Sequence, residues 1–244
     1  MNSSQAVIAF GAAFVAGAVN SVAGGGTVLT FPTLIWLGLP SVTANATNTA
    51  MVWPGSLGGV WGYWRELRRA KPRMLALVIP SALGGLAGAL LLRWTPPDVF
   101  DRLVPFLILF ATLLFMVQGR LKTTRTMGLV GATAFQFAVG VYGGYFGAGI
   151  GILMLAALGI LGLTDIYEMN ALKNFFALAI NGIAALYFMW MHMVSWPFVL
   201  VMAVGAIAGG YLCAGVARRI GPVAVRRIVV AIGVVMAVSL FLKR

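Results

Sequence analysis

NSVAGGGTVLTFP, residues 20–32, interrupts the first apolar part of the chain with three consecutive glycines. The apolar segment before the glycines covers about 6–22, and the segment after them covers only 27–39 before a proline. A helix needs about 20 apolar residues to cross a bilayer, so the second segment is too short to cross. Short segments after glycine breaks are typical of broken or re-entrant membrane helices, whose irregular backbone must line a cavity or be buried in protein. This stretch therefore predicts a membrane protein with a broken helix.

The composition of the whole chain agrees with a membrane protein. Apolar residues make up 61% of the 244 positions and charged residues only 9%, whereas a soluble domain carries about 25% charged residues. Ten apolar segments follow one another, at 6–22, 27–39, 44–64, 74–92, 103–117, 127–146, 150–163, 167–190, 196–216 and 225–242. The seventh segment, like the second, is short and follows glycines. We therefore expect an all-α, multi-pass helical bundle in the lipid bilayer.

The two halves of the chain resemble each other. Four short motifs recur in the same order at offsets of 123 to 125 residues: 14–17 with 137–140, 23–26 with 148–151, 38–40 with 162–164, and 45–46 with 170–171. Such a series predicts an internal duplication. Because each half holds five segments, the second half would be inserted upside down. We predict two inverted repeats, residues 1–119 and 120–244, each with a short helix after a glycine cluster.

Basic residues distinguish the two sides of the membrane. Twelve of them fall on one side of the predicted topology: Arg65, Arg68, Arg69, Lys71, Arg73, Arg120, Lys122, Arg125, Arg218, Arg219, Arg226 and Arg227. Four fall on the other side: Arg93, Arg102, Lys243 and Arg244. The positive-inside rule makes the first side cytoplasmic and puts both termini outside. The net charge of +12 does not predict a nucleic-acid partner, because basic and aromatic residues are not interleaved.

Glycines at four-residue spacing predict close helix packing. They form five pairs: Gly55 and Gly59, Gly58 and Gly62, Gly84 and Gly88, Gly140 and Gly144, and Gly205 and Gly209. Small residues at this spacing let helix backbones approach closely in lipid. We interpret these glycines as packing residues rather than as ligands.

Several motifs resemble the sulfite exporter TauE/SafE family. The first-half motifs are NSVAGGGT at 20–27, Phe31-Pro32, Gly38-Leu39-Pro40 and ANATN at 44–48, and GGYFGAGIG at 143–151 is similar to the repeated motif of that family. One departure is Ala157, which stands in the second half where the first half has Pro32. The resemblance covers nearly the whole chain. It implies a membrane permease for small anions, typically sulfite or organosulfur compounds.

The glycine clusters suit an anion site on physical grounds. Glycine lets backbone amides approach a ligand with no side chain in the way, and the helix after each cluster presents unpaired amides and the positive end of its dipole. Two such helix ends near the midplane would hold an oxyanion weakly enough to release it. The candidate glycines are Gly24, Gly25, Gly26, Gly147, Gly149 and Gly151. The alternative is that these glycines serve only close packing.

Polar side chains near the short segments complete the predicted substrate-binding set. They are Asn20 beside the first glycine cluster, Asn45, Thr47 and Asn48 at the start of the third segment, and Asn170, Lys173 and Asn174 at the start of the eighth. Their amide, hydroxyl and ammonium groups offer donors to an oxyanion. Helix capping or polar contacts between helices is the alternative.

Lys173 lies apart from the basic loops, about 10 Å into the eighth segment at a rise of 1.5 Å per residue. Two interpretations stay open. Its charge attracts the anion, or it reaches to the interface and pairs with Asp165 or Glu168, which would make it structural.

No motif predicts catalysis, a metal site or a cofactor. The single histidine, His192, and the single cysteine, Cys213, have no partners at metal-ligand spacing, and no nucleophile or phosphate-loop motif is present. We therefore expect a protein that is not an enzyme and that works without a cofactor.

The sequence thus predicts a permease for a small sulfur-containing oxyanion, such as sulfite or an organosulfonate, in the cell inner membrane. Export is favoured because a negative interior drives an anion outward by about 2.3 kcal/mol per charge per 100 mV. Two alternatives stay open: an uptake permease for another small solute, and a membrane scaffold or assembly protein without transport. The partners are a small anionic substrate and the lipid bilayer, and the sequence leaves homo-oligomerisation open.

Overall fold

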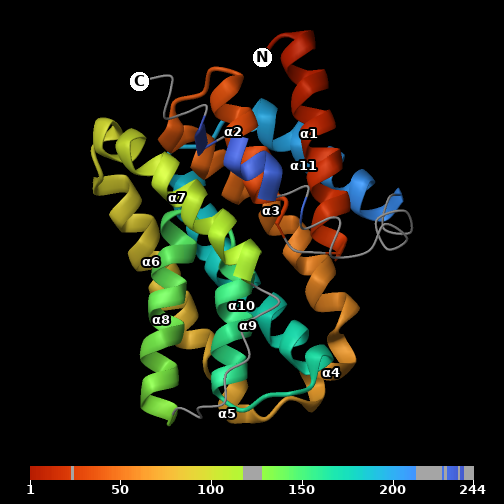
Figure 1. Cartoon of the computed structure of the whole chain (residues 1–244), viewed down its shortest axis with the longest axis vertical. Coiled ribbons are helices and arrows are strands. Elements are labelled where there is room, and N and C mark those ends of the chain that lie inside the picture. Colours follow the sequence, from red (N-terminus) through yellow and green to blue (C-terminus); the bar gives the residue numbers. More distant parts are fainter. Residues whose placement is uncertain (23–24, 118–127, 213–226, 228–229, 236, 239–244) are drawn as a thin grey trace.

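The computed structural model describes residues 1–22, 25–117, 128–212, 227, 230–235 and 237–238, and these residues form helices with no strand. Figure 1 shows the arrangement. In chain order the helices are α1 Ser3–Val22, α2 Thr27–Trp36, α3 Ser41–Gly62, α4 Trp64–Arg69, α5 Pro72–Leu75, α6 Val78–Trp94, α7 Pro97–Val117, α8 Leu129–Tyr145, α9 Ile150–Ile160, α10 Ile166–Trp190 and α11 Trp196–Leu212.

The first nine apolar segments each coincide with a helix, which confirms the all-helical fold class. The tenth segment lies largely outside the described residues, although 230–235 are helical. Helices α4 and α5 were not predicted from the sequence. They are six and four residues long and lie in the basic stretch between the third and fourth segments. Neither has an apolar run to reveal it, and Pro72 begins α5 at a position that proline favours.

Helix lengths separate spanning helices from short ones. Three stretches are long and apolar enough to cross a membrane, Ser3–Asn20, Pro72–Trp94 and Ile166–Trp190. By contrast, α2 and α9 have 10 and 11 residues. At 1.5 Å per residue they are roughly 15–17 Å long, about half the thickness of a bilayer core of about 30 Å. Both are therefore too short to cross alone.

The two short helices end in the same way. Gly38 after α2 and Gly162 after α9 have φ of 94° and 84°. The amide of the next residue reaches back five positions, from Leu39 N to Leu34 O and from Leu163 N to Leu158 O, each at 3.1 Å. This Schellman motif needs a left-handed residue, which glycine adopts without strain. The shared motif at positions 124 residues apart agrees with the internal similarity of the sequence.

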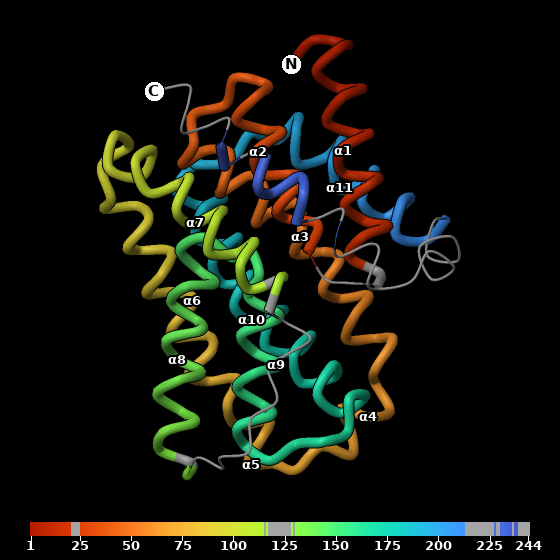
Figure 2. Tube along the Cα trace, in the orientation of Figure 1, coloured from red at the N-terminus to blue at the C-terminus, as the bar shows by residue number. Residues whose placement is uncertain are grey.

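Glycines bring two helix pairs into close contact, α1 against α11 and α6 against α8, and both pairs run side by side in Figure 2. A Cβ at Gly88 of α6 would lie 2.1 Å from Val141 O of α8, and a Cβ at Gly144 would lie 2.0 Å from Gly85 O. A Cβ at Gly209 of α11 would lie 1.8 Å from Phe14 O. The predicted packing role is therefore confirmed for the glycines of α6, α8 and α11.

The packing prediction is wrong for α3. Among the described residues, a Cβ at Gly55, Gly58 or Gly62 would meet nothing within 4 Å, and of the four glycines only Gly59 faces another helix, at Asn174 of α10. This end of α3 lies on the outer surface, where Trp61 is 85% exposed. Four-residue spacing identifies a smooth helix face but does not say whether another helix covers it.

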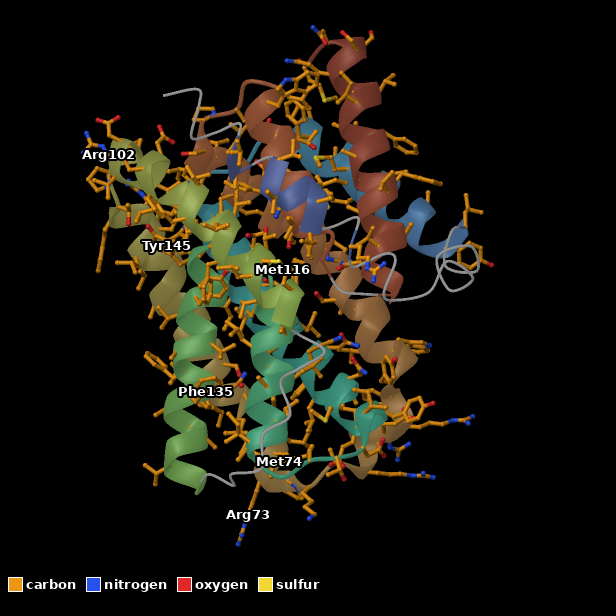
Figure 3. The ribbon with its side chains drawn as sticks, viewed as in Figure 1. Arg73, Met74, Arg102, Met116, Phe135 and Tyr145 are labelled. Atoms are coloured by element: carbon orange, nitrogen blue, oxygen red, sulfur yellow. The ribbon has the colours of Figure 1, made fainter. Side chains whose placement is uncertain are left out.

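The molecule has two distinct ends. Figure 1 shows the N-terminus at one end and α4 and α5 at the other. Figure 3 shows Arg73 and Arg102 at these opposite ends, as the predicted topology requires. Between them, α3 packs against α10 in the middle of the bundle, with fully buried side chains such as Phe31, Phe176 and Phe188 around them.

The variant Gly88→Val is expected to destabilise the protein by about 1–3 kcal/mol, because the larger side chain must push α6 away from α8. The measurement is the thermal unfolding of purified protein in detergent. Gly11→Val is the matched control, since a Cβ at Gly11 meets nothing within 4 Å. Equal unfolding temperatures for the two variants would contradict the packing role of Gly88.

Candidate functional site

The first glycine cluster forms the break between α1 and α2. Gly25 and Gly26 are buried, and Gly24 lies outside the described residues. Asn20, an exposed residue near the end of α1, accepts a hydrogen bond from Gly26 N at 3.3 Å. A Cβ at Gly26 would lie 2.5 Å from Ala16 O, so close packing also requires glycine there. Asn20 therefore stabilises the start of α2 through this hydrogen bond, although its side chain is exposed.

The second glycine cluster forms the break between α8 and α9. Gly147 and Gly149 have φ of 77° and 76°, a left-handed backbone that favours glycine. Gly149 is buried and immediately precedes α9. The Tyr142 hydroxyl donates to Ala148 O at 2.6 Å, which holds the turn from α8. At this break the glycines are therefore required by the backbone conformation itself.

The two breaks lie close to each other. Phe31, in the second turn of α2, packs edge-on against Phe146, which precedes Gly147, with ring centroids 5.1 Å apart. Helix α7 contacts both α2 and α9. The beginnings of the two short helices, far apart in sequence, therefore belong to one region of the fold.

Buried side chains of α3 connect both breaks. Asn45 Nδ2 donates to Tyr145 O, at the end of α8, at 2.8 Å. Asn48 lies one turn after Asn45 on α3, and its Oδ1 accepts a hydrogen bond from the Thr30 hydroxyl of α2. Thr47 faces elsewhere, since its hydroxyl accepts from Ser195 N before α11 at 2.9 Å. These side chains do not cap α3, whose N-cap is Pro40 with no side-chain bond. Each of the three side chains therefore makes a polar contact with another segment, and a part in binding stays a prediction for all three.

Asn45 nevertheless keeps one unused polar atom. Its side chain is fully buried, and Asn45 Oδ1 is the single buried side-chain nitrogen or oxygen without a hydrogen-bond partner in the part of the chain that the structure describes. An unpaired buried acceptor costs free energy, so such an atom in a native structure needs an explanation. A bound ligand is one.

The polar residues of α10 lie beside the second glycine cluster. Lys173 Nζ donates to Asn170 Oδ1 at 2.8 Å, and its Cδ would lie 3.4 Å from a Cβ at Gly151 of α9. Lys173 makes no ion pair with Glu168 or with Asp165. Asp165 instead caps α10 and accepts from Tyr167 N at 2.9 Å. The ion pair that the sequence left open as one of two interpretations is therefore absent among the described residues.

The predicted residues thus fall into two groups. Gly26, Asn45 and Asn48 gather between α2, α3 and the α8–α9 break. Lys173 lies against Gly151, in the first turn of α9, and donates to Asn170. Helix α9, which begins after Gly149, links the groups. Asn174 lies apart and faces Gly59 of α3.

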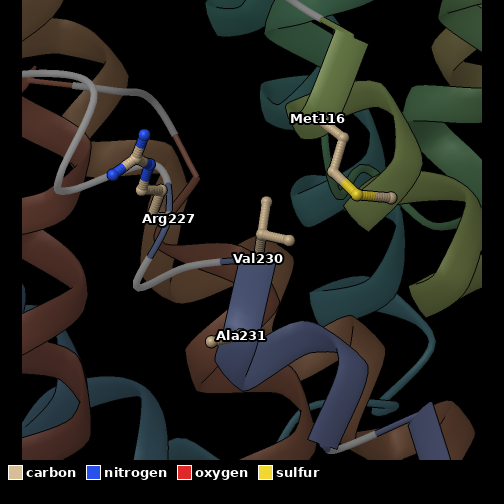
Figure 4. Close-up of a pocket in the computed structure, with 4 residues that line it drawn as sticks. All are labelled: Met116, Arg227, Val230 and Ala231. Atoms are coloured by element: carbon tan, nitrogen blue, oxygen red, sulfur yellow. The ribbon is translucent and has the colours of Figure 1, made fainter.

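A hollow of about 280 Å³ lies near the start of α2 and is lined by Met116 of α7 and by Arg227, Val230 and Ala231. Figure 4 shows Met116 on a different element from Arg227, Val230 and Ala231. One turn beyond Val230, a Cβ at Gly233 would lie 3.1 Å from Val28 Cγ1 in the first turn of α2. From its sequence, Arg227 is predicted only as one of the basic residues on the cytoplasmic side. No pattern in the sequence predicts its position beside this hollow.

The model of the family described as Sulfite exporter TauE/SafE matches residues 9–240. The chain belongs to the TauE/SafE family. Individual relatives agree over nearly the full length of the chain. The probable membrane transporter protein ORF9 of Sinorhizobium sp is 27% identical over 235 residues, which cover 95% of this chain and 90% of the relative.

Two further relatives extend the comparison. The probable membrane transporter protein YfcA of Escherichia coli strain K12 is 27% identical over 237 residues, with 96% of this chain and 88% of YfcA covered. A probable membrane transporter protein of Haemophilus influenzae is 28% identical over 245 residues, with 96% and 93% covered. Membership of the TauE/SafE family makes this chain an integral membrane protein of a transporter family, as the sequence predicted.

Proposed function

We propose that this TauE/SafE protein is a permease that moves a small sulfur-containing oxyanion, such as sulfite or an organosulfonate, out of the cell across the inner membrane. The observation that carries the proposal is the junction of the two glycine breaks. The Phe31–Phe146 contact and the bonds of Asn45 and Asn48 hold the starts of α2 and α9 in one buried region. A helix start presents the positive end of its dipole, which favours anions. At α2 the amides of Gly26, Val28 and Leu29 already donate to Asn20 Oδ1, Gly25 O and Gly26 O, so the dipole end is the main attraction that α2 offers.

Two inverted repeats, residues 1–119 and 120–244, explain this junction, and their boundary lies outside the described residues. The helix packing supports them. A Cβ at Gly209 would lie 1.8 Å from Phe14 O, and a Cβ at Gly84 would lie 2.3 Å from Phe137 O. Phe14 and Phe137 are 123 residues apart, and Gly84 and Gly209 are 125 apart. Exchanging the two halves therefore turns one contact into the other, as a pseudo-twofold axis requires.

The proposed substrate-binding groups are backbone amides at the two helix starts and nearby side chains. They are Asn20, Gly24, Gly25, Gly26, Asn45, Thr47, Asn48, Gly147, Gly149, Gly151, Asn170, Lys173 and Asn174. Asn20 acts indirectly, because it holds the start of α2 through Gly26 N. Thr47 also acts indirectly, because it holds Ser195, just before the start of α11. With a single cationic side chain, Lys173, among mostly neutral donors, the site binds an anion reversibly, as transport requires. Arg227, at the hollow near α2, attracts the anion from the cytoplasmic side.

The orientation of the protein follows from its charged ends. Arg73 is expected to face the cytoplasm and Arg102 the outside, because basic loops stay cytoplasmic. In a Cys213→Ala background, Arg102→Cys is expected to react with a membrane-impermeant thiol reagent added to intact cells, whereas Arg73→Cys reacts only after the cells are opened. Strong external labelling of Arg73→Cys would contradict the proposed topology.

The proposed function is tested by flux in proteoliposomes. Purified protein is expected to release sulfite, and to discriminate among sulfite, sulfonates, thiosulfate and sulfate. An inside-negative potential should speed efflux and an inside-positive potential slow it, since each charge gains about 2.3 kcal/mol per 100 mV. Protein-free liposomes are the control. Flux of all these anions at the protein-free rate would contradict the proposed function.

A further inference from the structure

The orientation of the Asn45 side chain is determined by its neighbour. Tyr145 O is a carbonyl oxygen and only accepts hydrogen bonds, so the amide nitrogen of Asn45 must face it. Exchanging the amide oxygen and nitrogen would place two acceptors against each other. Asn45 Oδ1 is therefore the atom left without a partner, and it presents a lone pair that only a donor satisfies.

The position of this atom ties it to the anion site. Asn45 lies on α3 one turn before Asn48, which binds the first turns of α2 through Thr30. Its own amide nitrogen holds the last residue of α8, just before the second glycine cluster. Asn45, which carries the unpaired acceptor, therefore contacts the end of α8 just before the α9 break and lies one helical turn from the residue that binds α2.

A single unpaired acceptor fits one class of partner. A metal cation takes several oxygen ligands at once, and an ordered water makes about three hydrogen bonds. Here one acceptor alone is unpaired among the described side chains. A fully deprotonated oxyanion carries only acceptors and would repel Asn45 Oδ1. An anion that bears one N–H or O–H group satisfies both the acceptor and the helix starts.

We infer that the transported anion carries a hydrogen-bond donor that binds Asn45 Oδ1, so that hydrogen sulfite or an amino- or hydroxyl-bearing sulfonate is selected over donor-free anions. This inference rests on the proposed function and narrows its substrate class. Asn45 is the residue that sets this selectivity. A donor-free anion leaves the acceptor unpaired in the bound state, which weakens its binding by about fivefold or more.

Sulfamate and methanesulfonate make a matched pair for the test, because both are monoanions of similar size and differ by an amino in place of a methyl group. Each is used as an inhibitor of sulfite flux in proteoliposomes. With the wild-type protein, sulfamate is expected to inhibit at a concentration about fivefold or more below that of methanesulfonate. In Asn45→Ala the ratio is expected to fall towards one. Gln136→Leu, which removes another buried amide bonded to Ser81, should keep the wild-type ratio.

The outcomes separate the two proposals. Equal inhibition by both anions in the wild type, or no inhibition by sulfamate, would overturn the inference while sulfite transport stands. Absence of sulfite flux itself would contradict the proposed function instead. The wild-type comparison needs no variant, so a failure of Asn45→Ala to fold does not affect it. A ratio that stays high in well-expressed Asn45→Ala would also overturn the role of Asn45.

Discussion

Replacing Lys173 by Met is expected to raise the KM for the transported anion by about 10- to 100-fold, because a hydrogen bond to a charged group contributes about 1.5–3 kcal/mol. The Lys173 side chain lies against Gly151 in the first turn of α9 and donates to Asn170. No described carboxylate pairs with it, so its removal leaves no unpaired acid behind. The measurement is flux at several anion concentrations, normalised to protein in the membrane.

Two controls distinguish substrate attraction from a structural role. Lys173→Arg keeps the charge and should lose less affinity than Lys173→Met. Glu168→Gln should change neither KM nor abundance, and combining it with Lys173→Met should not restore transport, because the two side chains make no ion pair. An unchanged KM in Lys173→Met at normal abundance would remove Lys173 from the site. Recovery in the double variant would instead assign it a structural role.

Substituting Gly149 by Val is expected to abolish transport while protein remains in the membrane. At φ of 76° a non-glycine residue is strained by about 1–2 kcal/mol, and a β-branched residue tolerates this region least. Relief of this strain would turn the first amides of α9 away from the position where the anion is proposed to bind. The measurement is flux per molecule of membrane-inserted protein, with Gly149→Ala expected to show a smaller loss.

Gly159→Ala is the matched control for this second experiment. It lies in the last turn of the same helix, and its Cβ would meet only Met169 Cε, at 3.9 Å. It should therefore transport at the wild-type rate. Normal flux through Gly149→Val would reduce Gly149 to a turn residue with no part in binding.

The contact of Lys173 shows how far sequence spacing alone reaches. Residues three apart lie on the same face of a helix, whereas residues five apart do not. Asn170, three positions before Lys173, was therefore the better partner on spacing, and Glu168 was the worse. Charge alone left Asp165 and Glu168 open as partners, whereas the structure has the amide contact that the spacing favours.

The sequence by itself determined the class of protein and the position of nearly every long helix. Apolar runs and glycine breaks can be recognised from local composition. Lipid permits only backbone whose polar groups are paired within their own segment or buried in protein, so each membrane segment carries such a local pattern. The short lengths of α2 and α9 could be predicted from the sequence for the same reason. The helices α4 and α5 were not, since six- and four-residue helices in a charged stretch carry no such pattern.

Only the tertiary structure decided which faces meet. The glycine pairs of α3 and of α6 have the same spacing, yet both Gly84 and Gly88 touch α8 while only Gly59 of α3 meets another helix among the described residues, because packing depends on where the rest of the chain lies. The same holds for Asn45. Its amide nitrogen donates to a carbonyl oxygen 100 residues away, while its amide oxygen has no hydrogen-bond partner among the described residues. Hydrogen-bond pairing over such separations is a property of the folded arrangement, and no local pattern encodes it.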